Sequence, residues 1–193
     1  CRRENLRTVA VTAGYIRGEA RRDFFAGMDA ANVDLKAFTD RFYRDLCGGD
    51  LQTVLDTLVY LKRETRVWFE ITTLLIPGEN DSEGEIDALS RWVARELGPD
   101  VPLHFTAFYP TWKLTDRPPT PPATLRRARQ QALRAGLRYV YTGNVRDPDG
   151  AATRCHACGN LLIARDGYTL TEWGMERDGR CRRCGTACAG VFE

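Results

Sequence analysis

Four cysteines near the end of the chain have the spacing of a metal site. They form two Cys-x2-Cys pairs, Cys155 with Cys158 and Cys181 with Cys184. A glycine follows each pair, and glycine tolerates the positive φ that a tight turn around a metal favours. Four thiolates complete a tetrahedral shell and leave no open coordination position, so the pattern predicts a structural metal site. We expect zinc, with iron or an auxiliary iron–sulfur cluster as the alternative that uses the same ligands.

A second group of chemically interesting residues lies on predicted strands. Side chains two residues apart on a strand point to the same face. One face of three predicted strands therefore carries Asn32, Asp34 and Lys36, then Glu70 and Thr72, then His104 and Thr106. The strands of a covered parallel sheet are normally apolar on both faces, so polar faces turned to a common interior predict a ligand cavity near the carboxyl ends of the strands. The plainer interpretation is that Asp34 and Lys36 neutralise one another and that His104 is an ordinary core histidine.

The elements that would position these residues alternate regularly. Apolar, β-branched segments predict strands at 8–12, 31–35, 67–76, 101–108 and 139–142, and helical patterns lie near 19–28, 51–64, 83–97 and 122–135. This order predicts an α/β fold with a parallel sheet, as a partial (βα) barrel of the TIM type. The turn-rich break near 147–150 divides a first domain, 1–147, from a small zinc-ribbon module, 148–193, with strands near 161–164 and 168–171.

Composition narrows the classes of function. The 193 residues include 28% charged residues and carry a net charge of only +2. So small a charge does not favour nucleic-acid binding on electrostatic grounds. Arginines surround the cysteines, but arginine is spread over the entire chain, so nucleic-acid binding is disfavoured. No apolar run is long enough to cross a membrane. Seven cysteines without a secretory pattern favour a reducing compartment, and we expect the cytoplasm.

Several short motifs occur in an order that resembles a known enzyme family. They are Thr12-Ala13-Gly14-Tyr15, Val33-Asp34-Leu35-Lys36, Leu75-Ile76-Pro77-Gly78-x-Asn80-Asp81, Pro102-Leu103-His104 and Arg138-Tyr139-Val140-Tyr141-Thr142-Gly143-Asn144-Val145, followed by the four cysteines. The set resembles radical S-adenosylmethionine (SAM) enzymes of the glycyl-radical-activase type, and most closely those of the AmmeMemoRadiSam system. The resemblance covers essentially the entire chain.

The resemblance implies a reaction and a set of cofactor contacts. In such enzymes a [4Fe–4S] cluster cleaves SAM reductively, and the resulting 5′-deoxyadenosyl radical abstracts a hydrogen atom from a substrate. It implies that Asp34 and Lys36 contact the methionyl end of SAM and that His104 lies near the nucleoside. Thr12 and Gly14 match a strand-end motif of the family, and Thr72 stands where activating enzymes commonly carry arginine.

One departure from the family pattern is decisive for what this chain can do. The cluster motif Cys-x3-Cys-x2-Cys is absent, and Cys1 and Cys47 are isolated. We therefore expect the C-terminal portion of such an enzyme, with the cluster ligands outside this chain and no radical chemistry from the chain alone. The substrate, a protein or a small molecule, is not readable. Memo-like and AMMECR-like proteins are partner hypotheses by association with the family.

Two other functions remain open. Lys36, two residues after Asp34 at a strand end, could form a Schiff base as in a lyase or aldolase. The chain could also be a non-catalytic interaction module that docks a partner through its metal ribbon.

Overall fold

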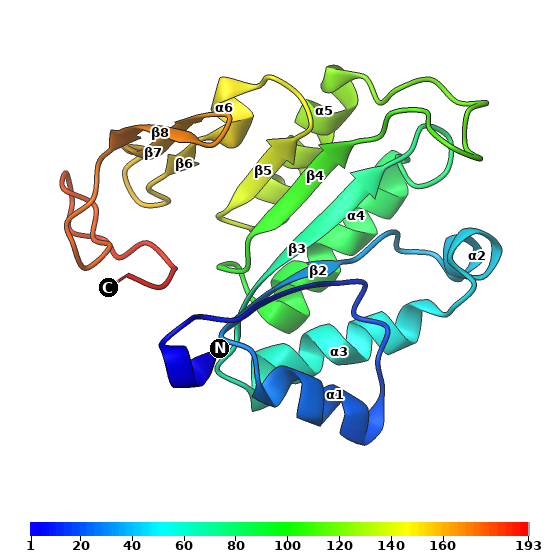
Figure 1. Ribbon diagram of the computed structural model, residues 1–193. Coiled ribbons are helices and arrows are strands. Elements are labelled where there is room, and N and C mark those ends of the chain that lie inside the picture. The colour runs from blue at the N-terminus through cyan, green and yellow to red at the C-terminus, as the bar shows by residue number, and fades with distance from the viewer. Residues whose placement is uncertain (193) are drawn as a thin grey trace.

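The chain folds around a parallel sheet with helices on one side. The structure is a computed structural model that describes residues 1–192, the side chain of Arg2 excepted. The sheet order is β1-β2-β3-β4-β5, with β1 at Val9–Thr12, β2 at Ala30–Asp34, β3 at Trp68–Leu75, β4 at Leu103–Ala107 and β5 at Val140–Gly143 (Figure 1). The predicted α/β alternation is confirmed. The described strands form an open sheet, and they do not close into a barrel.

The helices connect successive strands, and several of them begin at a capping side chain. Helix α1 spans Gly18–Ala26, α2 spans Asp40–Phe42, α3 spans Leu51–Glu64, α4 spans Glu83–Trp92, α5 spans Pro122–Arg134 and α6 spans Pro148–Ala151. A 3-10 turn covers Arg2–Glu4, and π-helical turns at Tyr43–Cys47 and Val93–Leu97 extend α2 and α4. The side chains of Asp50 and Ser82 cap α3 and α4 by accepting a backbone N–H of the first turn, as N-cap residues do.

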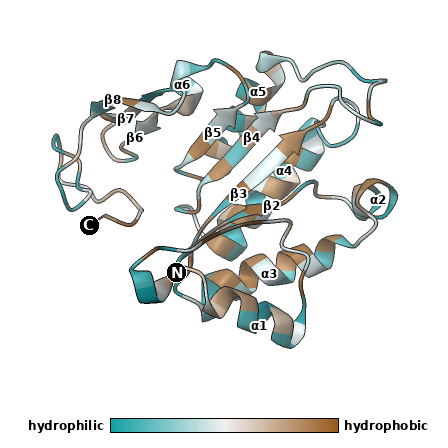
Figure 2. Cartoon of the chain, viewed as in Figure 1, coloured by the Kyte–Doolittle hydropathy of each residue, from teal (hydrophilic) through white to brown (hydrophobic). Residues whose placement is uncertain are grey.

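The two faces of the sheet differ sharply in burial. One face, covered by the helices, contributes fully buried residues such as Val33, Ile71 and Phe105 to the core. Apolar residues concentrate along the central strands and α3 (Figure 2). The opposite face, here called the open face, carries the intervening half-buried or exposed residues, and Val11 on β1 is 81% exposed there. The predicted polar residues of β2, β3 and β4 all belong to this open face.

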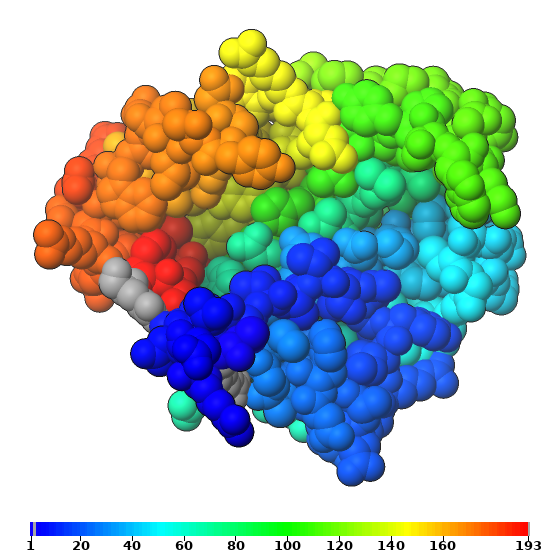
Figure 3. All heavy atoms as spheres, in the orientation of Figure 1, coloured from blue at the N-terminus to red at the C-terminus, as the bar shows by residue number. Residues whose placement is uncertain are grey.

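The four cysteines of the two Cys-x2-Cys pairs lie in a small C-terminal unit. It is called the cysteine module here and comprises residues 148–192; residue 193, with which the predicted module ends, lies outside the described residues. Strands β6 (Thr153–Arg154), β7 (Leu161–Asp166) and β8 (Thr169–Trp173) form an antiparallel sheet. In Figure 3 the module, yellow to red, lies against the yellow-green segment that contains β5. None of the described helices is both long and apolar enough to cross a bilayer.

Candidate cofactor face and metal centre

Four residues from four neighbouring strands form one row across the open face. Asp34 of β2 is in register with Thr72 of β3, Thr72 with His104 of β4, and His104 with Tyr141 of β5. Residues in register on a parallel sheet point to the same side, so these side chains share one surface. The sheet therefore brings together three residues that the sequence singled out, and it adds Tyr141, which was not among the candidates.

Asp34 and Lys36 form an ion pair at the carboxyl end of β2. Lys36 Nζ lies 2.9 Å from Asp34 Oδ2, and their side chains are 40% and 36% exposed. Water screens such a pair, so its contribution to stability is ~0–1 kcal/mol. The two groups do neutralise one another, but they remain accessible. A ligand that carries both an ammonium and a carboxylate can exchange partners with them.

The backbone that carries Lys36 is held from two sides. The Lys36 N–H donates to the Tyr43 hydroxyl at 3.1 Å, and the Lys36 carbonyl accepts from Asn80 Nδ2 at 2.7 Å. Burial raises the pKa of Tyr43. Asn80 also accepts the Ile76 N–H and donates to the Leu74 carbonyl. The Pro77–Asp81 motif therefore acts as a clasp that joins the ends of β2 and β3.

His104 is paired with a carboxylate on the neighbouring strand. Its Nε2 lies 2.6 Å from Glu70 Oε2. Burial would raise the pKa of Glu70, but the hydrogen bond and charge of His104, helped by Trp68 and Arg165, outweigh it and leave that pKa below its usual value. An ionised carboxylate only accepts, so Nε2 carries the proton. Nδ1 makes no hydrogen bond to the described residues.

Tyr141 links this pair to the cysteine module. Its ring stacks on His104 with the centroids 5.0 Å apart and the planes at 26°. Its hydroxyl lies 2.9 Å from Thr153 Oγ1, and the Arg165 guanidinium carbon is 5.8 Å from the ring centroid. Sequence reasoning missed both Tyr141 and Arg165. One signal was available: Tyr139 and Tyr141 are two residues apart on the predicted last strand, so their side chains share a face.

Thr12 and Gly14 lie away from the polar row. Thr12 is in register with Val33, which faces the helices, and its hydroxyl accepts the Gly14 N–H at 3.1 Å. Gly14 has φ +66°, and a Cβ there would lie 2.8 Å from Val33 Cγ1. These contacts place both residues at the turn that follows β1.

The four cysteines meet as the spacing predicts. Their Sγ atoms all lie within 4.8 Å of one another, with Cys155 3.6 Å from Cys184 and Cys158 3.8 Å from Cys181. A tetrahedron with metal–sulfur bonds of about 2.3 Å has sulfur–sulfur edges of about 3.8 Å, so the donor set fits Zn²⁺ or Fe.

The two turns of this metal centre have the same local structure. The Gly159 and Gly185 amides each donate to the carbonyl of the first cysteine of the preceding pair at 2.8 Å. Both glycines have positive φ. The side chain and amide of Thr186 lower the pKa of Cys184 to about 6, which favours the thiolate that binds metal.

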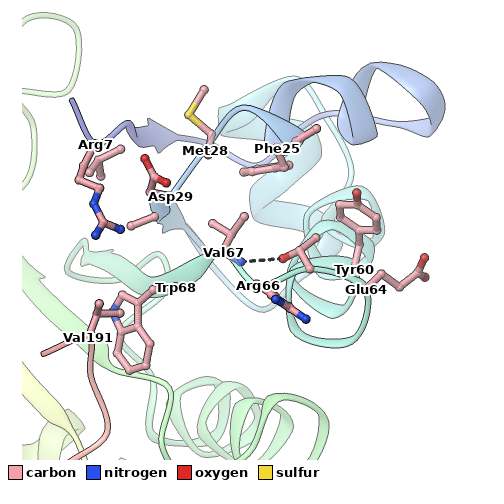
Figure 4. A pocket seen from close by; sticks show the side chains of 14 residues that line it. Arg7, Phe25, Met28, Asp29, Tyr60, Glu64, Arg66, Val67, Trp68 and Val191 are labelled. Atoms are coloured by element: carbon pink, nitrogen blue, oxygen red, sulfur yellow. Dashed lines mark hydrogen bonds between the residues drawn. The ribbon is translucent and has the colours of Figure 1, made fainter. Parts of the chain in front are cut away.

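A cavity of about 790 Å³ lies at the other end of the sheet. Its walls come from the amino ends of β1–β3, from α1 and α3, and from Val191 of the cysteine module. Figure 4 shows Trp68 and Val191 side by side along one wall. Sites in parallel α/β folds gather at the carboxyl ends of the strands, so this cavity is separate from the candidate cofactor face.

Comparisons with known proteins support the fold. No family model matches the chain. An uncharacterised protein of Methanocaldococcus jannaschii is 40% identical over 185 residues, which cover 95% of this chain and 54% of that protein. The chain thus spans about half the length of this relative. A domain of pyruvate-formate lyase-activating enzyme from Bacteroides vulgatus matches with a TM-score of 0.62 at 17% identity, over 75% of this chain and 85% of that domain.

A second solved structure points to the same fold. A radical SAM methyltransferase from Sphaerobacter thermophilus matches with a TM-score of 0.50 at 17% identity, over 82% of this chain and 46% of that enzyme. The chain therefore has an α/β fold like that of radical SAM domains.

Proposed function

We propose that the chain is the C-terminal portion of a radical SAM enzyme and that its open face binds SAM. The assignment to the AmmeMemoRadiSam system is part of this proposal and stands on the motif order. When bound beside a [4Fe–4S] cluster, SAM supplies a 5′-deoxyadenosyl radical for hydrogen abstraction. The residues of this chain would bind and orient the cofactor.

The observation that carries the proposal is the accessible Asp34–Lys36 pair in the same polar surface as His104. The amino-acid end of SAM has an ammonium and a carboxylate, which complement a carboxylate and an ammonium 2.9 Å apart. Thr72, between Asp34 and His104 in register, offers a hydroxyl to the same ligand. Thr12 and Gly14 would act on this site only through the backbone after β1.

The catalytic cluster does not fit the residues of this chain. Among the described residues, the four cysteines of the module are the one group of three or more potential metal ligands. Cys1 and Cys47 are both exposed and have no such group around them. We therefore propose that the cluster ligands belong to another part of a longer enzyme, as the length of the relative suggests. The module would hold one structural Zn²⁺.

The test measures SAM affinity by isothermal titration calorimetry with the metal-loaded chain. Variant Lys36→Met removes the ammonium and keeps the stem, and Lys62→Met on α3 is the matched control. We expect Lys36→Met to weaken SAM binding about tenfold or more, since a charge-assisted hydrogen bond contributes ~1.5–3 kcal/mol. Equal affinity for both variants would refute the cofactor face. Formation of 5′-deoxyadenosine by the full-length relative, with a reconstituted cluster, tests the reaction.

The described surroundings of Lys36 do not favour a Schiff-base enzyme. A lysine nucleophile is activated by an apolar pocket or by another cation. Lys36 instead faces a carboxylate and is 40% exposed. Borohydride trapping with a carbonyl substrate is expected to give no adduct at this residue.

A further inference from the structure

The cysteine module is attached to the edge of the open face through two tyrosines of the last sheet strand. The Tyr139 hydroxyl accepts the Ala189 N–H at 3.0 Å. The Tyr141 hydroxyl shares a hydrogen bond with Thr153 Oγ1 at 2.9 Å. Figure 3 shows the module closely packed against this edge. Both contacts use side chains that would otherwise face solvent on the polar side of the sheet.

Arg165 of β7 fixes the same tyrosine from the module. Its guanidinium carbon lies 5.8 Å from the Tyr141 ring centroid, within the range of a cation–π contact. One of its nitrogens, Nη1, donates to the Ala151 carbonyl at 2.9 Å and to Thr153 Oγ1 at 3.0 Å. The arginine therefore has a defined position, which a solvated surface arginine lacks.

His104 lies against the ring that the module holds. Its imidazole stacks on Tyr141, and Glu70 accepts its Nε2 proton. The charged or titratable groups around His104 are Glu70 from β3, Tyr141 from β5 and, beyond that ring, Arg165 from the module. An uninterrupted series of contacts thus runs from the module to the histidine of the candidate cofactor face.

The metal determines whether the module can make these contacts. The hydrophobic cluster of the module contains just four buried residues, Cys155, Leu162, Met175 and Cys181, and two of them are candidate ligands. So small an apolar core cannot hold a fold without a metal. Loss of the metal would release β6 and β7, and with them Thr153 and Arg165.

We propose that the cysteine module is part of the open-face site, with Arg165 and Tyr141 as positioning residues that hold His104 only when the four cysteines carry their metal. The metal then has a role at the sheet, some distance from its own ligands. The inference rests on the proposed function only for the identity of the ligand that His104 would meet. The coupling itself is a property of this chain and is tested without SAM.

The test uses the fact that the chain has only two histidines. Imidazole ¹⁵N–¹H spectra of the metal-loaded chain, assigned with His104→Gln, give the exchange rate of the His104 Nε2 proton with water. Variant Arg165→Gln removes the cation, and Arg165→Lys keeps it. Arg154→Gln is the matched control, because Arg154 is an exposed module arginine paired with Asp149.

We expect about tenfold faster exchange in Arg165→Gln, equivalent to ~1.4 kcal/mol, and a similar or larger acceleration in the metal-free wild type. Arg154→Gln and Arg165→Lys should stay within about threefold of the wild type. Backbone amide signals of β2 and β3 report whether the main sheet remains folded after metal removal. Equal exchange rates in Arg165→Gln and Arg154→Gln, both with metal bound, would overturn the inference. If the wild-type chain does not bind SAM but Arg165→Gln still accelerates exchange of the His104 proton, only the cofactor proposal is refuted.

Discussion

Asn80 offers the sharpest test of how the strand ends are held. Its side chain is 2% exposed and makes three hydrogen bonds to backbone groups. Oδ1 accepts the Ile76 N–H at 2.7 Å, and Nδ2 donates to the carbonyls of Lys36 and Leu74 at 2.7 and 2.9 Å. Substitution Asn80→Ala leaves all three backbone groups without this partner.

The magnitude follows from the number of groups left unpaired. A buried polar group that loses its partner costs ~1–3 kcal/mol. Some water will enter at the strand ends, so we take the low end for each group and expect a loss of about 3 kcal/mol in the free energy of unfolding. For a chain of this size that corresponds to a fall of about 6–12 °C in Tm. Substitution Asn80→Asp keeps the volume but turns a carboxylate oxygen toward two carbonyl oxygens, so it should cost at least as much.

Urea denaturation of the metal-saturated chain, followed by far-ultraviolet circular dichroism, measures the loss. Asn32→Ala is the matched control, because Asn32 is half-buried on the open face and has no hydrogen-bonded side chain among the described residues; its effect should stay within about 0.5 kcal/mol. SAM affinity of Asn80→Ala should also fall, since Lys36 loses its backbone support. If Asn80→Ala lowers the free energy of unfolding by less than 1 kcal/mol, Asn80 does not hold the ends of β2 and β3 together as argued.

Three further predictions concern other parts of the chain. Gly14→Ala should cost about 2–3 kcal/mol, because positive φ strain is joined by a close approach to Val33, whereas Gly48→Ala at nearly the same φ has open space and should cost only ~1–2 kcal/mol; equal losses in urea denaturation would refute the packing argument. Hydrogen bonds from Thr53 lower the pKa of Asp50 to about 2, so its contribution is full above about pH 4 and is lost as the pH falls toward 2; the stability difference between wild type and Asp50→Ala should shrink over that interval, and a constant difference would contradict it. The purified chain should contain about one metal ion, Co²⁺ should give the spectrum of a tetrahedral thiolate site, and Cys181→Ser should lose the metal; an octahedral Co²⁺ spectrum would exclude the four-sulfur site.

The fold was largely predictable because its signals are local. All five strands predicted for the main sheet were found, since each is an apolar run bounded by Gly, Pro or a helix cap. The predicted strand 101–108 was too long at its start, where Pro102 has no N–H for the ladder. The helix near 83–97 ends in a π-helical turn, Val93–Leu97, which places both of these residues at 0% exposure. Sequence periodicity does not distinguish that widened turn from an α-helix.

The candidate site was predictable only in part. Strand alternation predicts which face of the sheet a side chain is on, but it does not predict which residue of the next strand lies beside it. Alternation placed Asp34, Thr72 and His104 on one side, and the register then aligned them. The pairing of His104 with Glu70 depends on how two strands are offset, which no single-strand pattern reveals.

The approach of Arg165 to Tyr141 depends on how two separately folded sheets meet, and it leaves no periodic signal at all. A half-exposed carboxylate–imidazole pair on a sheet face gains little from solvent-screened attraction alone. Its geometry therefore depends on what packs beside it, and here the described neighbour is the ring that the cysteine module holds. For this reason we propose that the metal centre, which the sequence identified as an isolated structural unit, also supports the open face.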